Sequence, residues 1–169
     1  MAIDRAQLLA MSGPQLDDLF RACPPGEIPD GDARGTALIG PGRWYERPLA
    51  WMVRRFWWQG KVFDAARSSL VNKVGPVSFK AIKAQVYRDA SWVDGGEAIV
   101  LDYTKTSLVA RKIHDEIRMA APGVYFGPVF WGRKKIAYFV VELMGIGRGS
   151  CRLEATEGAP AIPPRSIAT

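Results

Sequence analysis

Short runs in which apolar and polar residues alternate dominate the sequence from Lys61 to Leu143, and turn residues bound each run. A period of two places every second side chain on the same face of a β-strand, so each run predicts a strand with one buried face. The predicted strands are Lys61–Asp64, Ser69–Val74, Val77–Ile82, Lys83–Trp92, Glu97–Tyr103, Val124–Trp131 and Ile136–Leu143. Because few helices separate them, we expect a mainly β fold with a curved antiparallel sheet or a barrel.

Two glycine-containing turns predict which of these strands are neighbours. Asp94-Gly95-Gly96 is typical of a tight hairpin, since such turns need a positive φ that glycine adopts freely. It should pair Lys83–Trp92 with Glu97–Tyr103. Gly132-Arg133-Lys134-Lys135 should form a looser hairpin between the last two predicted strands.

Helices are expected to cap the sheet. Apolar residues recur at helical spacing near the N-terminus, in Leu8–Met11 and Gln15–Cys23, and again in Pro48–Trp58 and Leu108–Ala120. A first short strand is predicted at Gly35–Ile39. After residue 145 the composition turns to Gly, Ser, Ala and Pro. We therefore expect one barrel domain over residues 1–145, with helices at its N-terminus and inside it, and a flexible C-terminal tail over residues 146–169.

The bulk composition fits a single globular domain. A chain of 169 residues, 48% of them hydrophobic, is long enough to bury a core. The net charge is +6, and residues 51–148 carry 16 basic against 8 acidic residues. Such an excess is typical either of an anion-binding surface or of a sheet kept soluble by scattered cations. Because the basic residues are scattered singly, the second interpretation is favoured and nucleic-acid binding is not expected.

Several other features of the sequence argue against a metal or membrane role. Cys23 and Cys151 are far apart and neither belongs to a CxxC motif, so neither a disulfide nor a zinc site is expected. A single histidine cannot form a His-rich metal site. With no apolar run long enough to span a membrane and no signal-like leader, a cytoplasmic location is predicted, and no cofactor is implied.

Aromatic residues suggest an interior ligand site. The chain has six tryptophans, and an aromatic-lined interior suits an apolar or planar ligand. Filling of a barrel core is the favoured role of these rings, although a barrel of about eight or more strands has room for both. Lys61 follows Trp57-Trp58-Gln59-Gly60 and could meet a ligand carboxylate if it points inward, whereas lysine usually points outward. Along Glu97–Tyr103 the bulkier face holds Ile99, Leu101 and Tyr103, so Tyr103 is predicted to point inward.

Two short motifs resemble a bacterial family of unknown function. Gly31-Asp32-Ala33-Arg34-Gly35 is similar to its G-x-W-x-G segment, with Ala33 where the family has tryptophan, and Trp58-Gln59-Gly60-Lys61-Val62-Phe63 is similar to its W-x-G-K-x-F segment. The layout of residues 101–143 is also similar. The resemblance implies a lipocalin-like or fatty-acid-binding-protein-like barrel with an interior pocket for a small hydrophobic molecule. It supplies no catalytic residues.

The leading hypothesis is therefore a binding protein that holds a small hydrophobic or amphipathic, lipid-like molecule in a barrel. Its candidate ligand-binding residues are Trp58, Tyr87, Tyr103, Tyr125 and Phe130, with Lys61 or Arg118 as the anchor for an anionic group. The alternative is an enzyme that uses the same cavity, with an acid or base among His114, Asp102, Asp115 and Tyr103. A binder of nucleic acid or of an anionic surface is a third possibility. The oligomeric state, a homodimer included, stays open.

Overall fold

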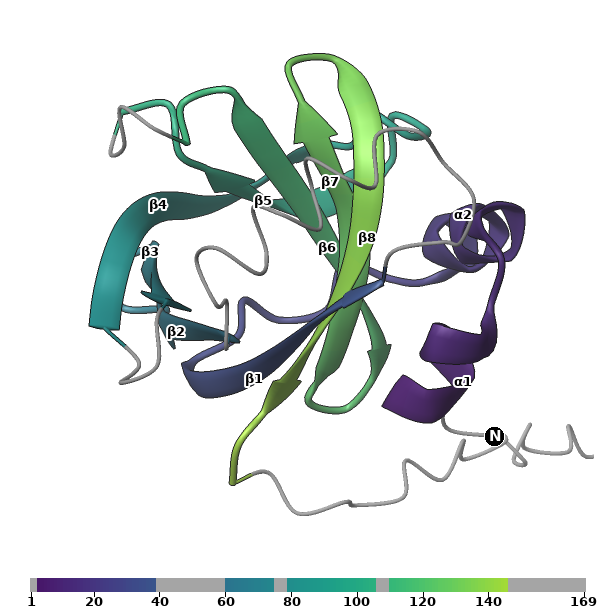
Figure 1. Cartoon of the computed structure of the whole chain (residues 1–169), viewed down its shortest axis with the longest axis horizontal. Coiled ribbons are helices and arrows are strands. Elements are labelled where there is room, and N and C mark those ends of the chain that lie inside the picture. Colours follow the sequence, from purple (N-terminus) through teal and green to yellow (C-terminus); the bar gives the residue numbers. More distant parts are fainter. Residues whose placement is uncertain (1–2, 39–59, 75–78, 106–109, 146–169) are drawn as a thin grey trace, which may run out of the picture.

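The chain forms a closed eight-stranded barrel with two helices packed against one side, as a computed structural model shows (Figure 1). The structure describes residues 3–38, 60–74, 79–105 and 110–145. The helices are α1 (Arg5–Ala10) and α2 (Gly13–Ala22). The strands are β1 (Gly31–Leu38), β2 (Gly60–Asp64), β3 (Ser69–Val74), β4 (Phe79–Ala90), β5 (Glu97–Asp102), β6 (Ile113–Ala121), β7 (Val124–Trp131) and β8 (Lys134–Leu143). The mainly β, antiparallel fold expected from the alternation is thus confirmed.

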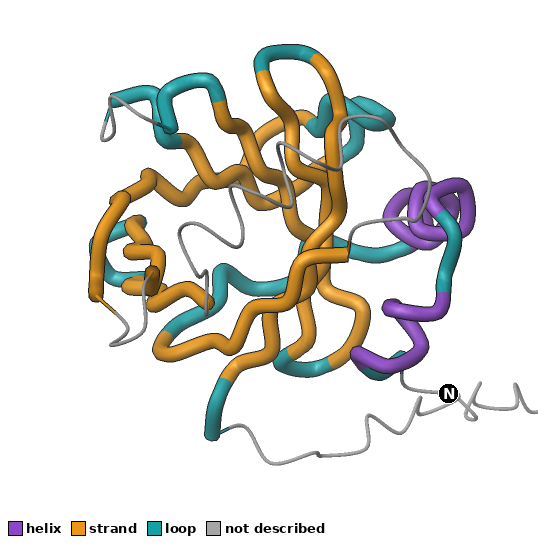
Figure 2. The backbone as a smooth tube through the Cα atoms, viewed as in Figure 1, coloured by secondary structure: helices purple, strands orange, loops and turns teal. Residues whose placement is uncertain are grey.

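Each strand pairs with its neighbours in sequence, and β1 closes the barrel by pairing with β8 as well as with β2 (Figure 2). All eight pairings are antiparallel. The predicted hairpin around Gly95 is confirmed. Its glycine has a φ of 74°, and Ser91 N donates to Gly96 O over 2.8 Å across the turn.

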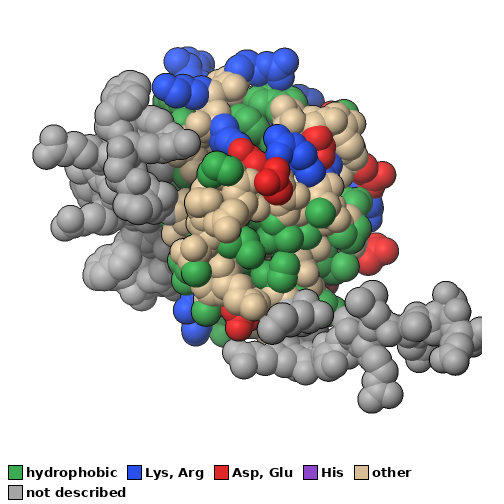
Figure 3. Space-filling model, turned by 90° about the vertical axis from the view of Figure 1, so that its right-hand side faces the viewer, with side chains coloured by type: hydrophobic (Ala, Val, Ile, Leu, Met, Phe, Trp, Pro, Cys, Tyr) green, Lys and Arg blue, Asp and Glu red, His purple; other side chains and the backbone are tan. Residues whose placement is uncertain are grey.

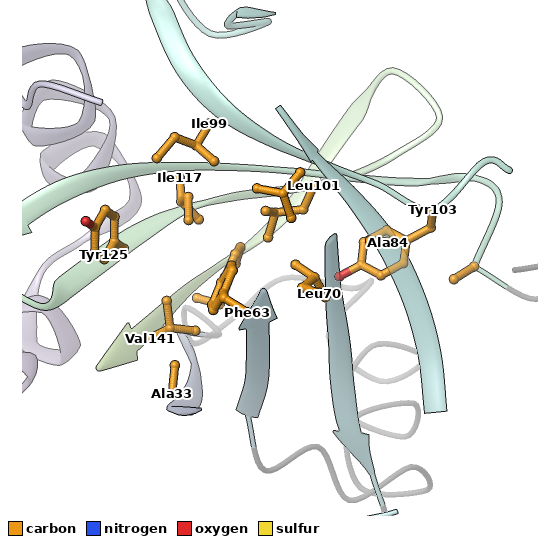
Figure 4. Close-up of a cluster of buried hydrophobic side chains, with 13 residues drawn as sticks. Ala33, Phe63, Leu70, Ala84, Ile99, Leu101, Tyr103, Ile117, Tyr125 and Val141 are labelled. Atoms are coloured by element: carbon orange, nitrogen blue, oxygen red, sulfur yellow. The ribbon is translucent and has the colours of Figure 1, made fainter. Parts of the chain in front are cut away.

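Two sets of buried side chains lie on opposite faces of the barrel wall. The inner cluster lies on the interior side and includes Phe63, Leu70, Leu101, Ile117 and Val141 (Figure 4). The outer cluster lies between the wall and the helices and consists of Leu8, Leu16, Phe20, Leu38, Ala98, Phe126, Tyr138 and Val140. Because helices cover the outer face of β5, β7 and β8, these strands are apolar on both faces. Figure 3 shows the helix-bearing side, where hydrophobic side chains mix with charged ones.

The α-helices begin where the sequence provides capping residues. Asp4 and Gln7 form a reciprocal capping box at the start of α1. At the start of α2, the backbone N–H and the hydroxyl of Ser12 both donate to Gln15 Oε1. In α2, Leu16 and Phe20 are buried one turn apart, and the Phe20 ring packs edge-on against Phe126 with centroids 5.9 Å apart. The predicted N-terminal helices are thus confirmed.

The segment Pro24–Asp30 crosses one end of the barrel, which we call the closed end. Its Pro24 carbonyl accepts a hydrogen bond from Met119 N over 2.9 Å, and its Glu27 carbonyl accepts one from the Tyr125 hydroxyl over 2.8 Å. Ile28 packs against the inner cluster. At the opposite end, which we call the far end, β1 ends at Leu38 and β6 begins at Ile113.

The predicted internal helix is wrong over the residues that the structure describes. Residues 113–121 form the central barrel strand β6, which pairs with β5 and β7. Ile113 and Ile117 are four residues apart, which fits a helix turn, but in the barrel they share the inner face of a strand. The outer face of β6 carries buried polar side chains, Glu116 and Arg118, so the strand lacks the simple apolar and polar alternation of a half-exposed one.

Two other strand boundaries differ from the prediction. The first strand begins at Gly31 rather than Gly35, because residues 31–34 pair through their backbones with β2. Two strands were expected, at Val77–Ile82 and Lys83–Trp92, but Phe79–Ala90 form a single strand, β4, that contains a bulge at Ile82. The predicted helix Pro48–Trp58 and the tail over residues 146–169 lie outside the described residues.

Candidate ligand-binding site in the barrel interior

Four polar side chains form a hydrogen-bonded cluster inside the barrel, near the far end. They are Lys61 from β2, Asn72 from β3, Tyr103 just after β5 and Asp115 from β6, and we call them the polar cluster. The Lys61 ammonium lies 2.6 Å from the Tyr103 hydroxyl oxygen, 3.0 Å from Asp115 Oδ2 and 3.2 Å from Asn72 Oδ1. At most 6% of any of these residues is exposed, so the cluster is closed off from bulk water.

Strand alternation places these side chains on the inner face. Asn72 shares the inner face of β3 with Leu70, and Asp115 shares the inner face of β6 with Ile117. Tyr103 continues the inner face of β5 after Ile99 and Leu101, and it belongs to the inner cluster (Figure 4). The prediction that Tyr103 points inward is therefore confirmed.

Lys61 is a buried cation with a buried counter-ion. Its side chain is 3% exposed and that of Asp115 is 7% exposed. The ammonium also lies 4.9 Å from the centre of the Phe139 ring and 5.4 Å from that of Tyr103. Burial by itself would lower the pKa of Lys61, but the interactions with Tyr103 and Asp115 outweigh burial and raise the pKa above its usual value. Lys61 thus stays charged at neutral pH.

Tyr103 keeps its proton. Burial and the negative charge of Asp115 raise the pKa of Tyr103 to about 12, although Lys61 acts in the opposite direction. The hydroxyl lies 3.2 Å from Asp115 Oδ2, to which it can donate, and it accepts from Asn72 Nδ2 over 3.1 Å. It is therefore a neutral hydrogen-bonding hub at neutral pH rather than a base.

One acceptor of the cluster has no partner among the described residues. Asp115 Oδ1 is buried and makes no hydrogen bond there, whereas Asp115 Oδ2 interacts with both Lys61 and Tyr103. A buried carboxylate oxygen without a hydrogen bond has lost its hydration, and no interaction with the protein compensates for that loss of free energy. Such an atom calls for a donor, which a water molecule or a ligand can supply.

Asn72 ties the polar cluster to the bulge in β4. Between Val71 and Asn72 the pairing of β3 with β4 skips Ile82, which has a φ of 61°. Asn72 Nδ2 donates to the Ile82 carbonyl over 3.1 Å. A left-handed conformation is costly for a β-branched residue, so this hydrogen bond helps to stabilise the bulge.

The structure separates the predicted ligand-binding residues into two groups. Lys61, Tyr103 and Tyr125 lie on the inner face, although Tyr125 lies at the closed end, where its hydroxyl binds the Glu27 carbonyl. Tyr87 and Phe130 lie on the outer face and do not line the interior. Tyr87 is 36% exposed and its hydroxyl lies 3.3 Å from Asp102, while Phe130 packs against Trp92 and His114. Trp58 lies outside the described residues.

Arg118 also lies outside the barrel interior, and its role in the structure is to fasten α2 to the barrel. Its guanidinium makes two hydrogen bonds of 2.8 Å to Asp94 and one of 2.8 Å to the Phe20 carbonyl. It also donates to the Glu97 carbonyl over 3.0 Å. With only 3% of its surface exposed, Arg118 directs its guanidinium to partners within the protein itself.

The acid and base candidates of the enzyme hypothesis do not converge on one site. Tyr103 and Asp115 lie inside the barrel, whereas Asp102 and His114 are paired on its outer face. His114 stacks on Trp92 with ring centroids 3.7 Å apart, and its Nε2 lies 3.1 Å from Glu116 Oε1. These outer residues form a separate aromatic and acidic cluster under the turn that follows β4.

Sequence reasoning missed Asn72 and the rim residue Trp131. Asn72 follows Leu70 by two residues in a correctly predicted strand, so its position on the inner face could have been inferred. Trp131 pairs with Ile113 at the far end of β6 and β7 and is 44% exposed. Because Ile113 packs against the inner cluster, Trp131 lies on the inward-facing side of the wall, at the rim.

Several basic side chains of the described residues pair with acidic ones, although the net charge of the chain stays at +6. Ion pairs on the barrel join Lys73 to Asp32, Arg88 to Glu97, Lys135 to Asp17 and Arg67 to Asp64. In the described part of the chain, no group of three or more His, Cys, Asp or Glu residues is placed to hold a metal ion. No helix within those same ranges is long and apolar enough to span a bilayer.

Comparisons with known proteins support the fold alone. No family model matches the chain, and no curated protein matches it. A solved structure, a crystal structure of a protein from Thermomonospora curvata, is similar with a TM-score of 0.55 and 19% sequence identity. The match covers 79% of this chain and 88% of that one. At this level of identity, the chain shares an overall fold with that protein, and the similarity says nothing about a ligand.

Proposed function

We propose that this protein binds a small, mainly apolar molecule inside its barrel, with the polar cluster of Lys61, Asn72, Tyr103 and Asp115 facing the polar end of that molecule. The observation that carries the proposal is Asp115 Oδ1, a buried acceptor without a partner among the described residues. Binding sites for small molecules are commonly apolar with a few polar groups that fix orientation. The inner cluster and the polar cluster together fit this description.

Binding is favoured over catalysis by the protonation states of the polar cluster. Tyr103, with a pKa of about 12, is neutral near pH 7, and Lys61, with a raised pKa, is charged there. A general acid or base is most effective when its pKa lies near the working pH. Neither group meets that condition, so both are better suited to orient a ligand than to transfer a proton.

The family resemblance, with its lipocalin-like barrel, remains part of this proposal. It supports the interior as the binding region, and it offers no more specific ligand than a small hydrophobic molecule. The proposed compartment is the cytoplasm, where a free thiol such as that of Cys23 stays reduced.

A titration with a neutral fluorescent probe tests the proposal. N-phenylnaphthylamine brightens in apolar surroundings, and we expect saturable binding with one probe per chain. An alkyl alcohol such as decanol should displace it. Probe emission that rises without saturation, or that decanol does not reduce, would contradict the proposal. Native mass spectrometry of the freshly purified protein should in addition reveal any retained ligand and the oligomeric state.

A further inference from the structure

The hydrogen bonds of the polar cluster restrict what a ligand can offer it. An ammonium group has three N–H donors, and Lys61 has three acceptors within 3.2 Å in Tyr103, Asp115 and Asn72. Asn72 uses its own amide to donate to Tyr103 and to the Ile82 carbonyl. The donors of the cluster are thus already occupied by the protein. An arriving acceptor would have to displace one of these bonds.

The charge of the cluster also disfavours a ligand that offers only acceptors. Lys61 and Asp115 form a buried ion pair of 3.0 Å, so their charges cancel. A ligand carboxylate in contact with the cluster would add a second negative charge beside Asp115. Moving a carboxylate from water into the barrel has a large desolvation free energy. Among these four residues no uncompensated cation is available to offset it.

We infer that the polar group of the ligand is a neutral hydrogen-bond donor, such as a hydroxyl, which binds Asp115 Oδ1. This inference rests on the proposed function, and it differs from the expectation that Lys61 anchors an anionic group. It predicts that the site prefers alkyl alcohols and similar apolar molecules with a hydrogen-bond donor over fatty-acid anions. Asp115 Oδ1 then gains the hydrogen bond that it lacks within the described residues.

A panel of three ligands of similar apolar size tests the inference on the wild-type protein. Decanol has a hydroxyl donor, decyl methyl ether has only an acceptor, and decanoate carries a negative charge near neutral pH. A hydrogen bond to a charged acceptor corresponds to a roughly tenfold or greater gain in affinity. We therefore expect decanol to displace N-phenylnaphthylamine with a Kd about tenfold lower than that of the ether, and decanoate to bind more weakly than decanol.

A substitution at Asp115 should reverse the preference. Asp115→Asn offers an NH2 donor in place of the unpartnered acceptor, and it leaves the charge of Lys61 without its counter-ion. Decanoate should then bind about tenfold or more tightly than decanol. Asp102→Asn is the matched control, because it removes the same charge on the outer face, where Asp102 binds Tyr87 and Thr104. It should keep the wild-type ranking.

The outcomes separate the inference from the proposed function. If none of the three ligands displaces the probe from the wild-type protein, the proposed function fails. If they bind but the ether or decanoate equals decanol, only the inference is overturned, and an ordered water becomes the partner of Asp115. Should the Asp115→Asn protein fail to fold, as circular dichroism would reveal, the wild-type ranking alone decides between these outcomes.

Discussion

Arg118 holds Asp94 through two hydrogen bonds of 2.8 Å each, and it binds the last turn of α2 with the same guanidinium. Asp94 lies in the turn between β4 and β5, and Phe20 lies in the N-terminal helix, so one side chain joins segments about 75 residues apart in the sequence. The forked, planar shape of the guanidinium makes this possible, since it presents five donors in fixed directions.

Replacing Arg118 should therefore loosen the helices without changing the interior. Arg118→Lys keeps the charge but loses the fork, and we expect it to lower the free energy of unfolding by about 2–4 kcal/mol in urea titrations. Arg67→Lys is the control, because Arg67 makes an exposed pair with Asp64 and should cost less than about 1 kcal/mol. Equal effects of the two substitutions would refute a fastening role for Arg118.

Protonation of Asp94 should lower the free energy of unfolding at acidic pH. Its hydrogen bonds from Arg118 lower its pKa below the usual value of 3.8. A carboxyl group whose pKa is lower in the folded state stabilises the fold above its unfolded pKa, and it loses that contribution as the pH falls through the folded pKa. Asp94→Asn should thus reduce the loss of stability that urea unfolding measures as the pH falls below the unfolded pKa of Asp94. An unchanged slope would contradict this.

Deprotonation of Tyr103 should lower the free energy of unfolding at alkaline pH. Its pKa rises from 10.0 to about 12 on folding, so the folded protein holds this proton more tightly than the unfolded chain does. Stability is then lost as the pH rises above 10, and the raised pKa of Lys61 acts in the same direction at higher pH. Tyr103→Phe should flatten the decline just above pH 10. Tyrosinate absorbance in the near ultraviolet should also show one fewer late-titrating phenol.

Ala84 and Gln85 test whether the interior has room for a ligand. These neighbours on β4 point to opposite faces, with Ala84 in the inner cluster and Gln85 exposed. Ala84→Leu should weaken probe binding by about tenfold while costing less than about 1 kcal/mol of stability, because the new side chain occupies ligand space. Gln85→Leu should change neither. If Ala84→Leu instead destabilises the fold by about 1–3 kcal/mol, the interior is packed by its own side chains.

Gly127 marks a position where only glycine fits. A Cβ atom added there would lie 1.8 Å from the Glu116 carbonyl oxygen, because β6 and β7 approach each other closely at this point. We expect Gly127→Ala to cost more than about 3 kcal/mol or to prevent folding, as judged by thermal denaturation. Gly13→Ala, where nothing lies within 4 Å of the added atom, should be neutral or slightly stabilising. A tolerated Gly127→Ala would show that the strands can separate.

Local patterns predicted most of the barrel, because most strands show their apolar face in the sequence. Ser69–Val74 and Val124–Trp131 were predicted with the bounds that the structure has. β6 could not be predicted in this way, since its inner face carries Asp115 and its outer face carries Glu116, both buried. Their partners, Lys61 and Ser91, are distant in sequence, so no local pattern indicates why these charges are inside.

The candidate site was predictable only in part, for a similar reason. Tyr103 could be placed from the faces of its own strand, whereas the partnership of Lys61 with Asp115 joins β2 to β6 and depends on closure of the barrel. The expected role of Arg118 failed because its turn and helix partners come from other segments. Predicting a contact between side chains on distant strands requires the pairing register of every strand between them. Local sequence patterns do not reveal that register.

The packing of α2 on β8 has a consequence for synthesis of the chain. Asp17 hydrogen-bonds Tyr138, a residue 121 positions later, and Leu16 and Phe20 are covered by the same late strands. A ribosome adds about 5–20 residues per second, so the apolar side of α2 emerges roughly 6–24 seconds before its cover exists. During that interval a nascent chain exposes Leu8, Leu16 and Phe20 to its surroundings. Chaperones that hold short apolar segments would therefore meet α1 and α2 before the barrel can close.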